Sequence, residues 1–474
     1  MITLRDYQQQ WITDIKQAMS RHRRVLAVMP TGAGKTICFS AITQGALAKD
    51  RRVLVLVHRA LILDQISDAL HKFDVPHGRI EPGHPASADS VQIAMVQTYA
   101  RRHERYGVPD LVIIDEAHHA VSATYARVLA LYPQAFILGV TATPLRLDGR
   151  GLGALFDALV LGPTVADLIA RGYLADYEYF APQPLVDLSA VRIVTGDYQR
   201  DDLAGALDKP KITGSAVGHY KTHAEGRPSI WFCVSLAHAE HVAAEFQAAG
   251  YQAASIDGSM DAGERRARLH GLADGSLQVL TSCDLIGEGV DVPAVSVIGH
   301  LRPTKSLAMK KQFDGRGLRL KPDGSKAMIF DHVGNHVLHG TPRTPVEWSL
   351  DSKRRKVSFR AEGVRQCLGC YRVLSVGEPV ECAERLPGCL AAKDTVFVGR
   401  EIDTTDGVLV TLSDQPEWAH GASLTLARGD EFRALVQAAT TREQLRVIAR
   451  ARGYNPRWVE HVLKSRGGSR HAVR

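Results

Sequence analysis

A glycine-rich stretch near the start of the chain, TGAGKT (31–36), carries residue types that could hold a nucleotide phosphate. An apolar run precedes it and a helical pattern follows, so backbone amides around Gly32 and Gly34 could wrap phosphate oxygens at a helix N-terminus. Lys35 could reach the β- and γ-phosphates, and the Thr36 hydroxyl could bind Mg²⁺. Met29 replaces the usual first glycine, so only the core of the pattern is present. The predicted phosphate-binding residues are Thr31, Gly32, Ala33, Gly34, Lys35 and Thr36.

Two adjacent carboxylates, Asp115 and Glu116, follow the apolar run that begins at residue 111. A buried strand would deliver them to the C-terminal edge of a parallel sheet, where ligand sites of α/β proteins form. There Asp115 could hold Mg²⁺ through water, and Glu116 could orient the water that attacks the γ-phosphate. The alternative is a simple acidic cap of a helix, which the position of the pair in the same predicted sheet as Lys35 disfavours.

Polar residues far from the glycine-rich stretch could complete a nucleotide site. Gln8 carries an amide, which offers both a donor and an acceptor to an adenine edge. Arg316 and Arg319 lie three positions apart in QFDGRGLRL (312–320). The alternative for the two arginines is a surface loop in which they serve solubility.

The apolar runs that must position these residues predict two α/β domains. Continuous runs separated by helix-length segments are typical of a parallel sheet covered on both faces. In the first half the runs are 25–29, 52–58, 91–98, 110–116 and 135–143, and in the second half they are 229–235, 251–257, 277–283, 294–301 and 326–333.

Composition narrows the class of protein. The 474 residues, 45% of them hydrophobic, can build two or three ordinary cores. No apolar run reaches the roughly 18 residues that cross a bilayer, and the opening residues lack a secretory pattern, so we expect a cytoplasmic protein without membrane contact. A net charge of +7 is compatible with a polyanion partner, although only weakly.

The motifs together resemble a known family. In order they are LRDYQ, MPTGAGKT, VHRALILDQ, VQTYARR, DEAH and TATP in the first half, then WFCVSLAHAEHVAAEF, TSCDLIGEGVDVP and QFDGRGLR in the second. This set is similar to that of the superfamily 2 DEAD/DEAH-box helicases over residues 1–340. Within that superfamily, LRPTKS, GRGLRL and IFDHVGN followed by a cysteine cluster look most like the RadD-type bacterial DNA helicases.

The resemblance implies a fold and a set of roles. It implies two tandem RecA-like domains, with ATP hydrolysed between them and Arg316 and Arg319 reaching across as arginine fingers. Further roles implied for the second domain are nucleotide contacts from Gly289 and Asp291. The implied coupling residues are His118, Thr141, Thr143 and Gln312, and the implied nucleic-acid contacts are Arg59, Gln65, Gln97 and Thr98.

Four cysteines crowd near the C-terminal end. Cys367, Cys370, Cys382 and Cys389 supply the four thiolates that a tetrahedral structural Zn²⁺ site needs, although the last pair departs from CxxC spacing and free or redox thiols are the alternative. Beyond them, Tyr454 and Trp458 among basic residues could meet nucleic acid or a protein partner, or could form the core of a small helical unit.

The predicted organisation has six parts. They are a RecA-like ATP-binding domain (1–160), a partly helical connector (161–228), a second RecA-like domain (229–340), a basic linker (341–364), a small zinc module (365–392) and a C-terminal helical accessory region (393–474). We expect an ATP- and Mg²⁺-dependent helicase or translocase that acts on DNA. The alternatives are an RNA-dependent ATPase, the motor subunit of a restriction system and an ATP-regulated nucleic-acid-binding scaffold.

Overall fold

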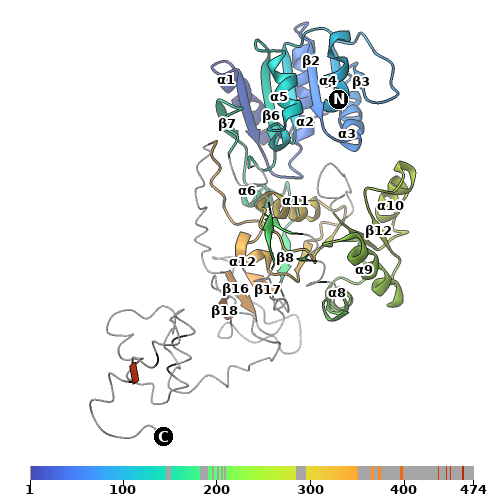
Figure 1. The fold of residues 1–474 in the computed structure, drawn as a ribbon, viewed down its shortest axis with the longest axis vertical. Coiled ribbons are helices and arrows are strands. Elements are labelled where there is room, and N and C mark those ends of the chain that lie inside the picture. Colours follow the sequence, from blue (N-terminus) through green and yellow to red (C-terminus); the bar gives the residue numbers. More distant parts are fainter. Residues whose placement is uncertain are drawn as a thin grey trace. The chain divides into compact units, whose positions relative to one another are not determined.

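The fold is taken from a computed structural model, which describes residues 2–145, 151–181 and 191–350 apart from 195–196, 200–201, 204–206, 208–209 and 284–294. After residue 350 it describes three short strands between 364 and 398 and single positions between 436 and 463. Residues 1–404 form one compact unit and residues 405–474 a second. The larger unit contains a parallel sheet and a mixed sheet that is mainly parallel, each the centre of a lobe (Figure 1).

The first lobe is built on a seven-stranded sheet in the order β3-β4-β2-β5-β6-β1-β7. All of its pairings are parallel. Its strands are β1 (Arg24–Val28), β2 (Val53–Val57), β3 (Gly78–Ile80), β4 (Val91–Met95), β5 (Leu111–Asp115), β6 (Phe136–Thr141) and β7 (Ala158–Leu161). The five runs expected in this half each contain a strand, so the predicted parallel sheet is confirmed.

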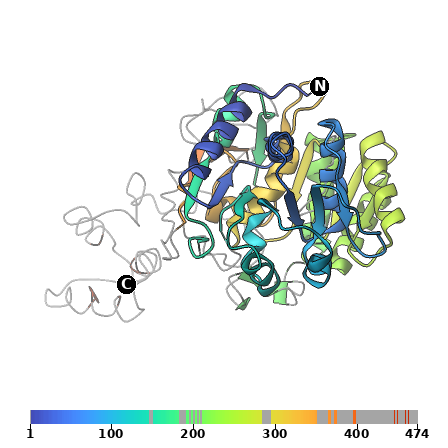
Figure 2. The same ribbon diagram turned by 90° about the horizontal axis from the view of Figure 1, so that it is seen from above.

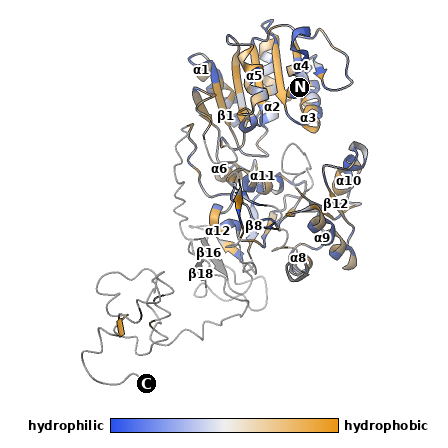
Figure 3. Ribbon diagram, in the orientation of Figure 1, coloured by the Kyte–Doolittle hydropathy of each residue, from blue (hydrophilic) through white to orange (hydrophobic). Residues whose placement is uncertain are grey.

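Both faces of this sheet are buried, as the apolar composition of its strands requires. In β2, Val53, Val55 and Val57 join one hydrophobic cluster and Leu54 and Leu56 join another, because side chains alternate between the faces. Helices cover the two sides (Figures 1 and 2), and the strands appear as hydrophobic in Figure 3. These helices are α1 (Asp6–Met19), α2 (Lys35–Leu47), α3 (Ala60–Lys72), α4 (Val96–Arg102) and α5 (Ala123–Ala130), with the 3₁₀ turns η1 (His103–Arg105) and η2 (Ala117–His119).

The second lobe has a nine-stranded sheet in the order β12-β13-β11-β14-β15-β8-β17-β16-β18. The strands from β12 to β8 are parallel, and β17, β16 and β18 extend the sheet in antiparallel fashion. Their bounds are β8 (Tyr177–Phe180), β11 (Ser229–Phe232), β12 (Ala253–Ile256), β13 (Val279–Ser282), β14 (Val297–His300), β15 (Ala327–Asp331), β16 (Val364–Cys367), β17 (Arg372–Leu374) and β18 (Thr395–Val398). Strand β8 comes from the segment that we expected to be a connector.

Six helices and a two-stranded ribbon complete the described part of this region. They are α6 (Val165–Ala170), α8 (Pro210–His223), α9 (Leu236–Ala248), α10 (Ala262–Asp274), α11 (Leu307–Gly317) and α12 (Asn335–His339), with β9 (Ile193–Val194) paired to β10 (Asp197–Tyr198). No described helix combines the length and the apolar character needed to cross a membrane. Most of the predicted zinc module and C-terminal helical region lies outside the described residues.

Candidate active site

The glycine-rich stretch forms a loop between β1 and α2. Gly32 and Gly34 have φ angles of 83° and 85°, which residues with a Cβ rarely adopt. Gly34 is the N-cap of α2, and Lys35 is its first residue. The Lys35 ammonium donates to the carbonyl of Pro30 at 3.4 Å. The loop therefore has the left-handed glycines and the helix N-terminus that a phosphate cradle requires.

Gln8 lies against this loop. Its side chain is buried, its Oε1 accepts from the Arg5 amide at 3.0 Å, and its Nε2 donates to the Ala33 carbonyl at 3.2 Å. The Tyr7 hydroxyl donates to the same carbonyl at 2.9 Å. A Cβ at Gly34 would lie only 2.5 Å from the Gln8 Nε2. Gln8 thus holds the phosphate loop directly, and its predicted contact with adenine stays a prediction.

Asp115 is the last residue of β5 and Glu116 follows it, two strands from β1 in the sheet order. Asp115 is buried, and burial together with the Glu116 carboxylate raises the pKa of Asp115 to about 7. Two crowded carboxylates of this kind call for a cation. The Asp115 carboxylate and the Thr36 hydroxyl are hard oxygen donors of the type that Mg²⁺ prefers, so these residues fit the predicted metal.

Glu116 occupies a strained position at the start of η2. Its φ of 50° and ψ of 55° are left-handed, which is uncommon for a residue other than glycine. Its Oε2 lies 3.4 Å from the Thr141 hydroxyl and 3.4 Å from the His118 Nδ1. Strain of this kind concentrates at functional sites.

The predicted coupling residues of the first lobe meet at the Thr141 hydroxyl. It accepts from the Thr143 amide at 3.1 Å, and the His118 Nδ1 lies 3.3 Å away. The rings of two histidines that we did not predict as site residues, His119 and His58, form a row with the ring of His118. The His118 and His119 rings are 4.2 Å apart between centroids, and the His119 and His58 rings are 4.1 Å apart. The signals available in the sequence were the histidine that directly follows DEAH and the histidine that directly precedes Arg59.

Helix α11 of the second lobe, which contains Arg316, and the residues just after it, which include Arg319, approach the phosphate loop. A Cβ at Gly315 would lie 2.5 Å from the Cβ of Thr31, and a Cβ at Gly32 would lie 3.5 Å from the Cγ of Arg319. The Arg316 and Gln312 side chains are buried. Burial lowers the pKa of Arg319 to about 10.

Charges from both lobes converge on Lys35. Burial lowers the pKa of Lys35, the carboxylates of Glu116 and Asp115 oppose that effect, and the guanidinium groups of Arg316 and Arg319 reinforce it. The other four side chains predicted to be catalytic therefore all act electrostatically on Lys35.

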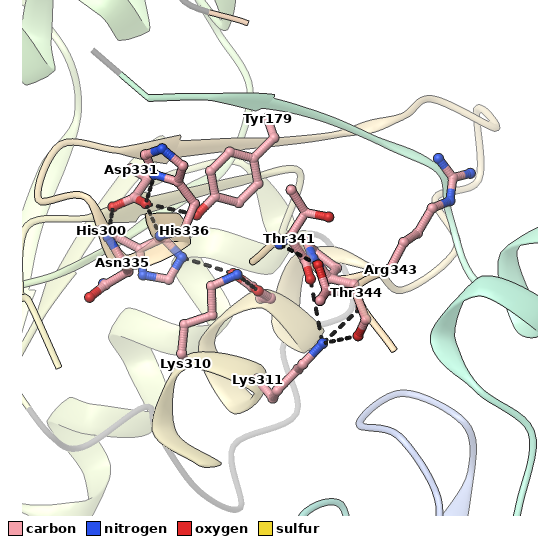
Figure 4. A network of polar contacts seen from close by, with 12 residues as sticks. Tyr179, His300, Lys310, Lys311, Asp331, Asn335, His336, Thr341, Arg343 and Thr344 are labelled. Atoms are coloured by element: carbon pink, nitrogen blue, oxygen red, sulfur yellow. Dashed lines mark hydrogen bonds and ion pairs between the residues drawn. The ribbon is translucent and has the colours of Figure 1, made fainter. Parts of the chain in front are cut away.

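A buried network that sequence reasoning missed holds α11 in its own lobe (Figure 4). Asp314 accepts from the Lys310 ammonium and lies 2.9 Å from the His300 Nε2. The three side chains are almost fully buried. Burial alone would raise the pKa of Asp314, but Lys310 and His300 hold it below its usual value.

A second carboxylate, Asp331 at the end of β15, lies in the same network. Its Oδ2 accepts from the Tyr179 hydroxyl at 2.9 Å and lies 2.8 Å from the His336 Nδ1. Although burial opposes ionisation, the contacts with His336 hold the pKa of Asp331 far below its usual range. Nothing in the sequence pairs these distant residues, so only the fold could find them.

The four residues implied to contact nucleic acid follow two neighbouring strands. Arg59 is the N-cap of α3 after β2, and Gln65 lies within α3. Gln97 and Thr98 begin α4 after β4. Because β2 and β4 are parallel neighbours, these side chains share the sheet edge from which the phosphate loop leaves. Gln97 is exposed, and the other three are half-buried.

Some predicted site residues cannot be placed. Gly289, Asp291, Cys370, Cys382 and Cys389 lie outside the described residues, and of Cys367 only the backbone at the end of β16 is described. Among the described residues, no group of three or more histidines, cysteines or carboxylates is arranged to hold a metal.

Two family models match the chain. Residues 1–146 match the type III restriction enzyme, res subunit, and residues 209–321 match the helicase conserved C-terminal domain. The chain is 36% identical over 322 residues to a 51.5 kDa protein of a Lactococcus phage (isolate 7-9), covering 67% of this chain and 68% of that protein. It is 28% identical over 354 residues to the putative ATP-dependent helicase IRC3 of Saccharomyces cerevisiae, covering 70% of this chain but 51% of the yeast protein.

A solved structure supports the fold. A fragment of a putative HsdR subunit of a type I restriction enzyme from Vibrio vulnificus YJ016 aligns with a TM-score of 0.58 and 22% identity, over 72% of this chain and 66% of that one. The sheets, the motifs and these matches define a class of protein whose members use ATP and Mg²⁺ and act on nucleic acid. The chain belongs to the superfamily 2 DEAD/DEAH-like helicases. The narrower resemblance to RadD-type helicases stays a prediction.

Proposed function

We propose that this chain is a DNA-dependent ATPase that translocates on or unwinds DNA and hydrolyses ATP between its two RecA-like lobes. The observation that carries the proposal is the convergence of Asp115, Glu116, Arg316 and Arg319 on Lys35. A protein that only bound ATP as a switch could dispense with the carboxylate and the arginines, because they stabilise the transition state rather than the ground state.

Each of these groups has a distinct role in the proposal. Lys35 and the loop amides bind the β- and γ-phosphates, and Thr36 and Asp115 hold Mg²⁺, which neutralises charge that develops on the phosphate oxygens. Glu116 accepts a hydrogen bond from the attacking water and orients it. Arg316 and Arg319 stabilise the charge on the γ-phosphoryl oxygens. Because the arginines belong to the second lobe, hydrolysis requires the lobes to be closed.

In this proposal, ATP hydrolysis is coupled to nucleic-acid binding because both sets of residues lie at the same sheet edge. Arg59, Gln65, Gln97 and Thr98 would contact the phosphate backbone, which confers little sequence preference. His118, Thr141 and Thr143 join Glu116 to the strand ends and would pass on changes at the γ-phosphate. Gln312, and Gly289 with Asp291, would add contacts from the second lobe.

DNA rather than RNA is supported by the match of the first lobe to a restriction-enzyme subunit, since restriction enzymes act on DNA. The same match favours a second candidate, the motor subunit of a restriction system. The two differ in whether a nuclease partner is required. A protein partner bound through residues 393–474 and a cytoplasmic location belong to the same proposal.

We also propose a structural Zn²⁺ site at Cys367, Cys370, Cys382 and Cys389. Its support is that β16 and β17 pair in antiparallel fashion and that Cys367 ends β16, with Cys370 three positions later in the sequence. Two thiolates at this sequence spacing suit tetrahedral zinc. Metal analysis of the purified chain should find one zinc per chain, lost in Cys367→Ser, and a metal-free wild type would overturn this site.

The central experiment measures the ATPase rate with single-stranded DNA, duplex DNA, forked DNA or RNA added. We expect stimulation by DNA, with Glu116→Gln abolishing turnover while retaining ATP binding. Stimulation by RNA alone would overturn the choice of DNA. An unchanged rate with every nucleic acid would overturn the translocase itself.

A further inference from the structure

Residues 341–350, here called the strap, lead from the second lobe to the first. The strap follows α12 at Gly340, which has a φ of 69°. It opens with a turn in which the Thr344 amide donates to the Thr341 carbonyl at 3.1 Å and the Thr341 amide donates to the Thr344 hydroxyl at 2.9 Å. The sequence indicated only a basic linker here, whereas its described part is packed at both ends.

Lys311 of α11 holds the first end of the strap (Figure 4). Its ammonium donates to the carbonyls of Pro342 at 2.9 Å, Thr344 at 3.3 Å and Thr341 at 3.4 Å. Three acceptors around one ammonium satisfy all of its donors. Lys311 is adjacent to Gln312 and shares its helix with Arg316, so the helix that carries Arg316 is itself bonded to the strap.

Strand β8 and the residue before it add further contacts at this end. The Tyr177 hydroxyl donates to the Thr341 Oγ1 at 3.0 Å. Arg343 forms an ion pair with Asp176 at 2.9 Å, and its guanidinium lies over the Tyr177 ring. The beginning of the strap is therefore fixed to the second lobe by side chains from two elements.

The other end of the strap is fixed to the first lobe. The Gly153 amide donates to the Leu350 carbonyl at 2.8 Å. A Cβ at Gly153 would lie 2.6 Å from that carbonyl oxygen, so only glycine allows this approach. Trp348 and Leu350 pack against the hydrophobic cluster of the first lobe that contains Phe156.

We propose that the strap is a mechanical link between the arginine helix α11 and the first lobe, with Lys311 as its positioning residue. A helix moves as a rigid element, so a pull on Lys311 displaces Arg316 on the same helix. The strap thereby ties the position of the arginines to the lobe that holds the phosphate loop. It also limits how far α11 can move when the lobes separate.

Hydrogen exchange tests this link without reference to activity. In Lys311→Met, the amide of Gly153 should exchange roughly tenfold faster, the equivalent of about one net hydrogen bond, although the substitution lies in the other lobe. Lys221→Met is the matched control, because Lys221 is an exposed lysine of α8 in the same lobe. Unchanged exchange at Gly153 would overturn the proposal.

A reciprocal variant changes the first-lobe end of the strap. Its result therefore does not depend on whether Lys311→Met disturbs the folding of the second lobe. Gly153→Ala should push the Leu350 carbonyl away and speed exchange at the Thr344 amide of the distant turn. Gly45→Ala is its control, since a Cβ at Gly45 meets open space. A change confined to the neighbourhood of Gly153 would count against the link.

The catalytic consequence rests on the proposed function. Lys311→Met and Gly153→Ala should each lower the DNA-stimulated kcat by about 10- to 100-fold, the cost of misplaced catalytic groups, with ADP affinity unchanged. The double variant should fall no further than the worse single variant, because both break one link. If the two losses of kcat multiplied in the double variant, that result would contradict the proposed link. If the wild-type protein hydrolysed no ATP, the proposed function would be wrong. The hydrogen-exchange results would still test the proposed link through the strap.

Discussion

Lys35 interacts with side chains of both signs of charge. The Asp115 and Glu116 carboxylates need a cation, and the Arg316 and Arg319 guanidinium groups need an anion. Burial strengthens the interactions of both kinds of group with Lys35, because it weakens the screening that water would supply. Magnesium-bound ATP carries both a cation for the carboxylates and an anion for the guanidinium groups.

The arginines give the first prediction. Arg316→Ala should lower kcat by about 10³- to 10⁵-fold, the range known for arginine fingers, with little change in ADP binding, because ADP lacks the γ-phosphate. Stopped-time ATPase assays and fluorescent ADP titration measure the two quantities. Arg266→Ala, at an exposed arginine of α10 in the same lobe, serves as the control and should retain wild-type kcat. Equal losses of kcat and ADP affinity would indicate a binding role instead.

Asp115 gives a prediction on stability. Its pKa in the folded protein, about 7, exceeds its ordinary value of 3.8, so between these pH values the folded state binds more protons than the unfolded state. The contribution of Asp115 to the free energy of unfolding should therefore fall as pH rises through this window. Urea unfolding at pH 5 and pH 8 in the absence of Mg²⁺ measures the change.

The Asp115→Asn variant isolates this effect. Asparagine does not titrate, so the stability of the variant relative to the wild type should rise between pH 5 and pH 8. The lowered pKa values of His332, His339 and Lys311 act in the opposite direction within this window, but these residues are present in both proteins and their effects cancel in the comparison. Identical pH dependences in the two proteins would contradict the raised pKa of Asp115.

At the scale of elements, the site is a set of short connections after parallel strands. β1, β5 and β6 are neighbours in the sheet, and their C-terminal ends deliver Lys35, Asp115 and Thr141. These positions were predictable because each motif is contiguous with the apolar run that carries it. The distance between motifs in the sequence does not matter once the strands pair in parallel.

Other elements could not be predicted, for physical reasons. The strand YEYF (177–180) contains the buried Glu178 and lacks the apolar continuity of its neighbours, so its place beside β15 depends on pairing that only the fold supplies. The partnership of His300, Lys310 and Asp314 is set by how α11 packs on β14. The left-handed backbone of Glu116 could not be predicted, because the DEAH motif contains no glycine to indicate that conformation.

The close packing of α11 on the phosphate loop gives a prediction at this scale. Gly315→Ala adds a Cβ that would lie 2.5 Å from the Cβ of Thr31, which is branched and cannot rotate away. The helix should shift from the loop and lower kcat by about 10- to 100-fold, as steady-state ATPase assays would show. Gly218→Ala in α8, where a Cβ meets open space, is the control. A fully active Gly315→Ala would show that this contact is absent during catalysis.

At the scale of the whole molecule, the site draws on both lobes of one chain. The phosphate loop and the carboxylates come from the first lobe, whereas Arg316 comes from α11 of the second lobe and Arg319 from the residues just after that helix. The two lobes are joined by the chain between β7 and β8 and again by the strap, so their effective concentration for each other is high. An arrangement of this kind predicts that a single chain is sufficient for hydrolysis.

Mixing two inactive variants tests whether one chain is sufficient. Lys35→Ala lacks the proposed phosphate-binding lysine, and Arg316→Ala lacks the proposed arginine finger, but each retains the group that the other has lost. If the site is completed within one chain, an equimolar mixture should remain as inactive as its components at every protein concentration. If a second chain supplies the arginines, mixed assemblies would contain one intact site and the ATPase rate would rise with concentration. A mixture of wild type with Arg316→Ala calibrates the assay, since an internal site predicts a rate equal to the wild-type fraction.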